Sequence, residues 1–181
     1  QDLCTNGGDV SLINSTEGVL YAEISALANN GTNRVITVFN SLDSSNRIRL
    51  YYTTTSNRVV AVIRSGTDQA SFFYDGISDV TQFSKFAISY KLNDFAFWVN
   101  GTKVGTDTNG ITPIGLNSIS FNDGSGDDKF FGKTKCLAVW KEALSDQELA
   151  DLTYPTPTDP TFTLDFDTIA EQFTFARGSE A

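Results

Sequence analysis

Residues 122–128 gather the oxygen-bearing side chains that a metal ion could use. The loop reads Asn-Asp-Gly-Ser-Gly-Asp-Asp, so it carries one amide at Asn122 and three carboxylates at Asp123, Asp127 and Asp128. Calcium takes hard oxygen ligands, including backbone carbonyls, from pliable loops. The bidentate glutamate of an EF-hand loop is missing. The loop therefore predicts either a site for Ca²⁺ as a cofactor, of another type than an EF-hand, or a solvated acidic turn.

A second set of residues has the chemistry of a sugar-binding site. Such sites stack aromatic rings on the apolar faces of sugar rings and place amides or carboxylates beside the hydroxyl groups. Tyr51 shares one face of an alternating stretch with Arg47 and Arg49, so we expect it to be exposed. The carbohydrate-binding residues that we predict are Tyr51, Tyr74, Asp75, Trp98 and Asn100.

Trp98 has two interpretations. It alternates in direction with Phe97 and Val99, so either Trp98 or these neighbours face outward. An outward Trp98 could stack on a sugar ring. The alternative is that Trp98, like Trp140, belongs to the core.

Catalytic chemistry is poorly represented in the sequence. The chain has no histidine, which removes His-dependent nucleophilic triads and His-based acid–base catalysis. Two cysteines without a histidine also argue against a zinc site. Two carboxylates from distant strands would suffice to hydrolyse a glycosidic bond, so a glycan hydrolase or lyase remains an alternative. We predict that the protein is not an enzyme.

The charge balance restricts the classes of macromolecule that the chain could bind. The formal net charge is −9, with 13 basic against 22 acidic residues. Binding to a phosphate backbone needs clustered Lys and Arg, so we expect no nucleic-acid partner. The balance also disfavours anionic membrane surfaces, and no apolar run is long enough for membrane insertion. A chain without methionine is expected to be a processed or excised segment, or else a mature secreted protein.

Cys4 and Cys136 lie far apart in the sequence. One interpretation is a disulfide between Cys4 and Cys136 that ties the N-terminal segment to a late strand in an oxidising compartment. The alternative is two independent thiols, with Cys136 acting as a small buried apolar residue.

Short alternating segments dominate the chain. We expect strands at 18–27, 34–39, 47–52, 58–64, 69–74, 83–91, 95–99, 118–121 and 129–140. Asn100 and Gly101 predict a tight hairpin, because a two-residue turn needs positive φ at both positions. The pattern predicts an all-β fold in which residues 1–154 form an antiparallel two-sheet β-sandwich of jelly-roll type. An immunoglobulin-like sandwich is the alternative, but it leaves the final helix unexplained.

That single short helix is predicted just after the last strand. Ser145 and Glu148 have the spacing of a capping box, and Leu144 and Leu149 have that of a hydrophobic staple. A helix of about two turns is not stable alone in water. We therefore expect it to pack against the sheet that the preceding strand completes.

Two stretches carry a family resemblance. Residues 135–152, an apolar strand followed by Ala-Leu-Ser, an acidic cap and Glu-Leu, resemble the closing strand and helix of laminin-G/pentraxin-like domains of the concanavalin A-like lectin/glucanase superfamily. Residues 95–104 are similar to a hairpin of that family. The resemblance implies a concanavalin A-like jelly roll, in which related lectins often bind calcium at loop ends. The Glu-x-Asp-x-x-Glu array of glucanases with this fold is absent.

Residues 155–181 differ in composition from the rest. The run 155–160 is a Pro-rich linker by composition, and we expect a following module to begin after it. The segment 164–181 resembles a junction in modular bacteriophage virion proteins. We therefore predict a carbohydrate-binding or adhesion module of a virion fibre, located at the virion surface or outside the cell. The alternative is a structural decoration domain that contacts virion subunits or its own trimer mates.

Overall fold

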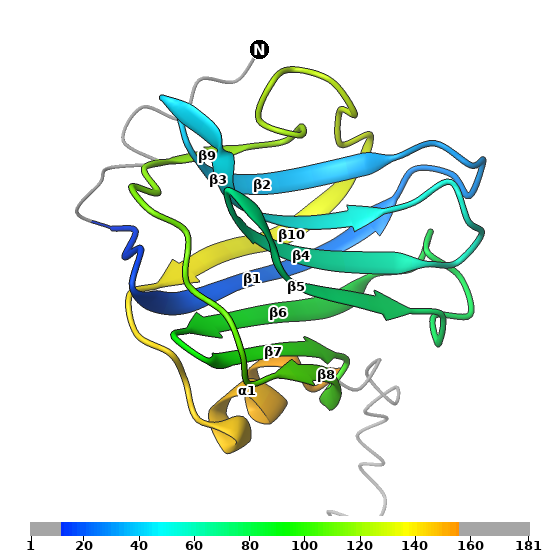
Figure 1. Ribbon diagram of the computed structural model, residues 1–181. Helices are drawn as coiled ribbons and strands as arrows, with labels where there is room; N and C mark the ends of the chain where they lie inside the picture. The colour runs from blue at the N-terminus through cyan, green and yellow to red at the C-terminus, as the bar shows by residue number, and fades with distance from the viewer. Residues whose placement is uncertain (1–11, 156–181) are drawn as a thin grey trace, which may run out of the picture.

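Two antiparallel sheets of five strands each pack face to face in residues 12–155, the part of the chain that the computed structural model describes (Figure 1). The strands are β1 Glu17–Ala26, β2 Arg34–Asn40, β3 Asp43–Tyr52, β4 Val59–Ser65, β5 Thr67–Tyr74, β6 Ser84–Lys91, β7 Asp94–Val99, β8 Thr102–Asp107, β9 Ser118–Ser120 and β10 Gly132–Trp140. The first sheet has the order β10-β1-β6-β7-β8, and the second has the order β5-β4-β3-β2-β9. The predicted all-β sandwich with one short helix is confirmed.

The core between the sheets comes from alternate residues of each strand. On β3, Ile48 and Leu50 are fully buried, as the alternating pattern predicted. Phe97 of β7 is central, because its ring stacks on Phe72 and on Phe86, with ring centroids 6.3 Å apart in both pairs. These rings connect the two sheets, since Phe72 belongs to β5 and the other two belong to the first sheet.

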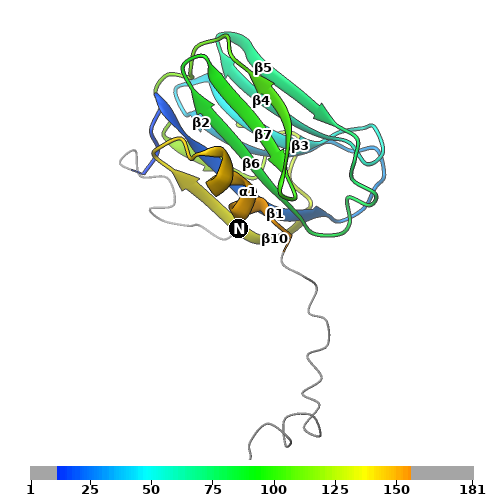
Figure 2. The same ribbon diagram turned by 90° about the horizontal axis from the view of Figure 1, so that it is seen from below.

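Helix α1, Asp146–Thr153, covers the outer face of the first sheet (Figure 2). Its capping box is confirmed: the Ser145 side chain accepts from the backbone N–H of Glu148, and Glu148 accepts from the backbone N–H of Ser145. Leu149 is only 1% exposed and belongs to a second apolar cluster on this face. The other buried members of this cluster are Val19, Tyr21, Ala87, Ala96 and Trp98.

Removing this cap should weaken the domain measurably. Replacing Ser145 by alanine is expected to lower the free energy of unfolding by about 1 kcal/mol, because the backbone N–H of Glu148 loses its side-chain acceptor. Urea denaturation followed by fluorescence measures the change. Ser145→Asp is the matched control, since aspartate also caps, and an equal loss in both variants would contradict the role of the cap.

The Asn100–Gly101 turn is also confirmed. Both residues have positive φ, 48° at Asn100 and 82° at Gly101, and they join β7 to β8. The predicted turn thus adds an edge strand, β8, to the first sheet.

The segment between β9 and β10 lies along the edge of β2 that is turned away from β3, beside the outer face of the second sheet. The hydroxyl of Thr37 donates to the carbonyl of Asn122 at 2.7 Å, and the backbone N–H of Val35 donates to the carbonyl of Asp128 at 3.1 Å. The acidic loop 122–128 therefore borders this face.

Candidate functional site

The outer face of the second sheet, which we call the Tyr51 face, is built from cross-strand rows. Antiparallel register places Tyr51 between Val35 and Val60, and Val60 beside Phe73. This first row is apolar. The next row, one step along the strands, places Arg49 between Thr37 and Val62, and the third places Arg47 between Phe39 and Arg64. An apolar row thus runs beside rows that carry arginines.

Tyr51 lies at the centre of this face, half-buried, as part of a stacked pair. The guanidinium carbon of Arg49 is 5.5 Å from the centroid of the Tyr51 ring. Val60 and Val62 form a buried floor beside the pair. Burial raises the pKa of the Tyr51 hydroxyl. As a phenol, this hydroxyl can both donate and accept a hydrogen bond.

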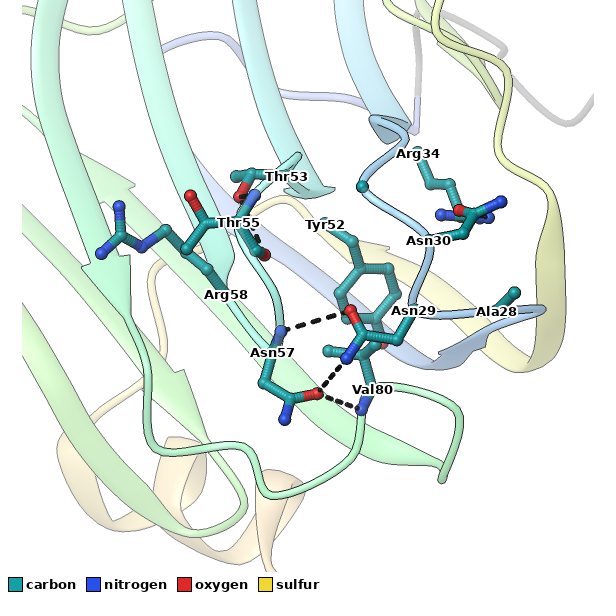
Figure 3. Close-up of a pocket in the computed structure, with 11 residues that line it drawn as sticks. Ala28, Asn29, Asn30, Arg34, Tyr52, Thr53, Thr55, Asn57, Arg58 and Val80 are labelled. Atoms are coloured by element: carbon teal, nitrogen blue, oxygen red, sulfur yellow. Dashed lines mark hydrogen bonds between the residues drawn. The ribbon is translucent and has the colours of Figure 1, made fainter.

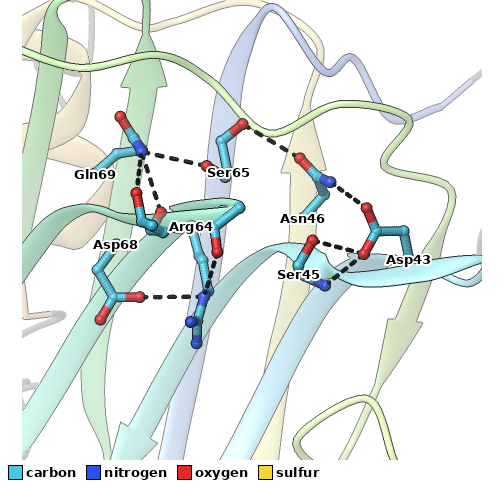
Figure 4. A network of polar contacts seen from close by, with 9 residues as sticks. Asp43, Ser45, Asn46, Arg64, Ser65, Asp68 and Gln69 are labelled. Carbon is cyan, nitrogen blue, oxygen red and sulfur yellow. Dashed lines mark hydrogen bonds and ion pairs between the residues drawn. The ribbon is translucent and has the colours of Figure 1, made fainter.

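The arginines of this face differ in their partners. Arg64 donates to the carbonyl of Gly66 and forms an ion pair with Asp68, with 3.6 Å between Nε and the carboxylate (Figure 4). Arg47 and Arg49, in contrast, each have a buried Nε with no hydrogen-bond partner among the described residues.

Phe73 extends the Tyr51 face to its edge strand, and the sequence-based set missed it. It is 62% exposed, and the guanidinium carbon of Arg58 lies 5.9 Å from its ring centroid. Arg58 in turn donates two hydrogen bonds to Asp75, at 2.6 and 2.8 Å, which hold the pKa of Asp75 below its usual value. The alternation of β5 could have identified Phe73. Because Phe72 points to the core, its neighbour Phe73 has to point outward.

Tyr74 and Asp75, two of the predicted carbohydrate-binding residues, lie in different surroundings. Asp75 lies near the Tyr51 face, but its carboxylate is already paired with Arg58. Tyr74 packs against the core between the sheets. Of the five predicted carbohydrate-binding residues, only Tyr51 presents an aromatic ring on this face.

The prediction for Trp98 as a sugar-stacking residue is wrong. The ring is 6% exposed, because α1 covers the outer face of the first sheet. Phe97 and Val99 are buried on the inner face of the same strand, so neither side of β7 is outward.

Asn100 likewise has a structural role. Its side-chain oxygen accepts from the backbone N–H of Lys85 at 2.8 Å, and its amide donates to the hydroxyl of Ser84 at 3.3 Å. It belongs to the first sheet, on the layer opposite the Tyr51 face, so the structure does not bring it together with Tyr51.

Two side chains of the acidic loop accept hydrogen bonds from the loop itself. Asp123 accepts from the backbone N–H groups of Ser125 and Asp127, and Asn122 accepts from the backbone N–H of Gly124. Within residues 12–155, no three metal-ligating acidic or cysteine side chains come together. The described geometry is that of an acidic turn, and calcium at Asn122, Asp123, Asp127 and Asp128 stays a prediction.

Cys136 is exposed on β10, and it is not the buried residue that the thiol alternative predicted. Cys4 lies outside the described residues, so the disulfide stays a prediction. No helix in residues 12–155 is both long and apolar enough to cross a membrane.

A small pocket opens where loops meet at one end of the sandwich (Figure 3). Asn29 and Asn57 close it, because the Asn29 amide donates to Asn57 Oδ1 at 2.9 Å and the backbone N–H of Val80 donates to the same oxygen. The Asn57 amide is also used, by the carbonyl of Ser78. These amides hold three loops together, and they offer a ligand few free groups.

Several solved structures share this architecture. The carbohydrate-binding module CBM40 of the Ruminococcus gnavus IT-sialidase, in complex with α2,3-sialyllactose, has a TM-score of 0.63 and 16% identity, covering 77% of this chain and 84% of the module. The leech intramolecular trans-sialidase has a TM-score of 0.62 and 18% identity, covering 79% of this chain and 24% of the leech chain. The SAP-like pentraxin of Limulus polyphemus has a TM-score of 0.59 and 15% identity, covering 77% of this chain and 70% of the pentraxin chain. At these identities, the likeness is one of fold.

The family is shown by the sequence itself. Among curated proteins, none matches the chain significantly. Residues 12–150, however, match the laminin-G-type profile of the concanavalin A-like lectin/glucanases superfamily. The matched range contains residues 95–104 and all but the last two residues of 135–152, the stretches whose resemblance predicted this family. Because this match spans most of the chain, the protein belongs to the concanavalin A-like lectin/glucanases superfamily.

Proposed function

We propose that this domain is a non-catalytic carbohydrate-binding module of a larger surface protein, and that it binds glycan through the Tyr51 face. The observation that carries the proposal is the half-buried Tyr51 ring beside an apolar floor, with arginine donors on one side and Phe73 on the other. An apolar platform can pack against the C–H face of a sugar ring, while polar groups at its border can bind the hydroxyl groups.

A solved neighbour gives independent support. The Ruminococcus gnavus module, of which the match covers 84%, is described as bound to α2,3-sialyllactose. A sandwich of this shape is therefore able to present a sugar-binding surface. Because one fold serves many functions, the Tyr51 face itself has to carry the assignment.

Assembly is the second candidate, and one observation favours it. Leu42 is 93% exposed and Ile114 is 67% exposed. The side chain of Asn40 binds the backbone N–H of Leu42 at 2.9 Å and the carbonyl of Ile114 at 3.1 Å, so the backbones that carry these two exposed side chains lie close together. This pair could contact virion subunits or trimer mates. The virion fibre itself is supported only by the sequence resemblance in 164–181, outside the described residues.

A glycan array tests the proposal. We expect binding by the domain, and about 5- to 30-fold weaker binding by Tyr51→Ala, because a central aromatic contributes about 1–2 kcal/mol to such an interface. Tyr154→Ala is the matched control, since Tyr154 is exposed beside helix α1, on the opposite layer.

The same array separates the alternatives. Adding a chelator should leave binding unchanged if 122–128 is only a turn, and should abolish it if calcium shapes the site. A domain that binds no glycan on a broad array and sediments as a trimer would overturn the proposal in favour of assembly.

A further inference from the structure

The arginines of the described chain divide into two groups by their partners. Arg34 donates to two carbonyls and to Asn30, Arg58 forms a bidentate pair with Asp75, and Arg64 is held by Gly66 and Asp68. The two others, Arg47 and Arg49, have no such partner within residues 12–155, and both of their Nε atoms are buried. These two are neighbours on one face of β3.

An unpartnered buried donor is unusual, because a charged group that loses its hydrogen bonds to water normally regains them in the protein. The electrostatics agree with the geometry. Burial, and next the positive charges of Arg49 and Arg64, lower the pKa of Arg47. Asp123 and Asp68 act in the opposite direction, but neither forms an ion pair with Arg47. The Arg47–Arg49 pair is thus a local excess of positive charge.

We propose that Arg47 and Arg49 bind the anionic group of an acidic sugar, a carboxylate or a sulfate, while the sugar ring lies on Tyr51. This inference rests on the proposed function. A guanidinium offers parallel N–H donors that match two oxygens of such a group. The apolar row that holds Tyr51 is adjacent to the row that holds Arg49, so one ligand can reach both.

The charge of the whole chain restricts the class of anionic ligand further. With a net charge of −9 over all 181 residues and the acidic loop beside β2, the chain repels dense polyanions at long range. Only short-range contacts at the arginine pair favour an anion. The ligand is therefore a glycan with isolated anionic groups, and double-stranded DNA should not bind.

An array with matched ligands tests this. It carries sialylated and glucuronylated glycans, the carboxyl methyl esters of the same glycans, sulfated glycans and neutral glycans. We expect binding to acidic members and about 10- to 100-fold weaker binding to their esters, because charge-assisted hydrogen bonds are lost. The sulfated members identify which anionic group is preferred.

Variants test whether the preference for acidic glycans depends on Arg47 and Arg49. Arg47→Gln and Arg49→Gln should each weaken binding to acidic glycans about 10- to 100-fold. Lys133→Gln, which removes the same charge from the exposed surface of β10 on the other sheet, should leave it unchanged. Arg49→Lys keeps the charge and loses the planar fork, so it should be intermediate. Thermal melts identify any variant that fails to fold, and the ester comparison needs no mutation.

The outcomes are distinct. Equal binding of acids and esters, binding restricted to neutral glycans, unaffected glutamine variants, or equal binding of a Glu-rich peptide would overturn the inference, even though glycan binding on the array upheld the proposed function. No binding to any glycan would overturn both.

Discussion

Replacing Leu149 by alanine is expected to lower the free energy of unfolding by about 2–5 kcal/mol. Leu149 is the buried leucine of α1 and packs into the apolar cluster formed by Val19, Tyr21 and Trp98 on the first sheet. An eight-residue helix has little stability of its own, so its position depends on this contact. Urea denaturation measures the loss, and Trp98 fluorescence should report a more exposed ring.

The matched control is Leu92→Ala. Leu92 is an exposed leucine in the β6–β7 turn, so the same deletion there removes little buried surface and should change stability by no more than about 0.5 kcal/mol. If both variants lost equal stability, α1 would not hold the outer face of the first sheet.

Replacing Phe97 by alanine is expected to cost about 3–5 kcal/mol. The Phe97 ring is fully buried between the rings of Phe72 and Phe86, and a close-packed interior relaxes only partly around the cavity that alanine would leave. Thermal and urea unfolding measure the change, with a lower midpoint expected in both.

Phe131→Ala is the control for this variant, because Phe131 is exposed in the segment before β10. A small effect at Phe97, comparable with that at Phe131, would mean that the two sheets do not share the packed core described here. Near-native stability together with retained glycan binding would contradict the assignment most directly.

Local features could be predicted from the sequence, because their causes lie within a few residues. The capping box needs only Ser145 and Glu148, and the hairpin needs only Asn100 and Gly101. The alternation of β3, with Ile48 inward and Tyr51 outward, is equally local. These signals were enough to define a sandwich.

Features that depend on distant segments could not be predicted in the same way. The two interpretations of Trp98 assumed that one face of its strand is exposed to solvent. Helix α1, some fifty residues later in the chain, covers that face. The partners of Arg49 across the sheet, Thr37 and Val62, come from two other strands. That no carboxylate in residues 12–155 forms an ion pair with either arginine depends on tertiary pairing, which no spacing in the sequence reveals.

The position of α1 determines how the Tyr51 face would be oriented relative to a support to which the chain is attached through residue 155. The chain leaves the described domain just after α1, where Lys85 donates to the carbonyl of Tyr154 at 2.9 Å. This exit is on the first sheet, whereas the Tyr51 face is on the second. A tether at residue 155 therefore directs the Tyr51 face away from its attachment point. Copies displayed on a common support could then engage a cell coat at several points, and avidity would amplify a weak individual contact.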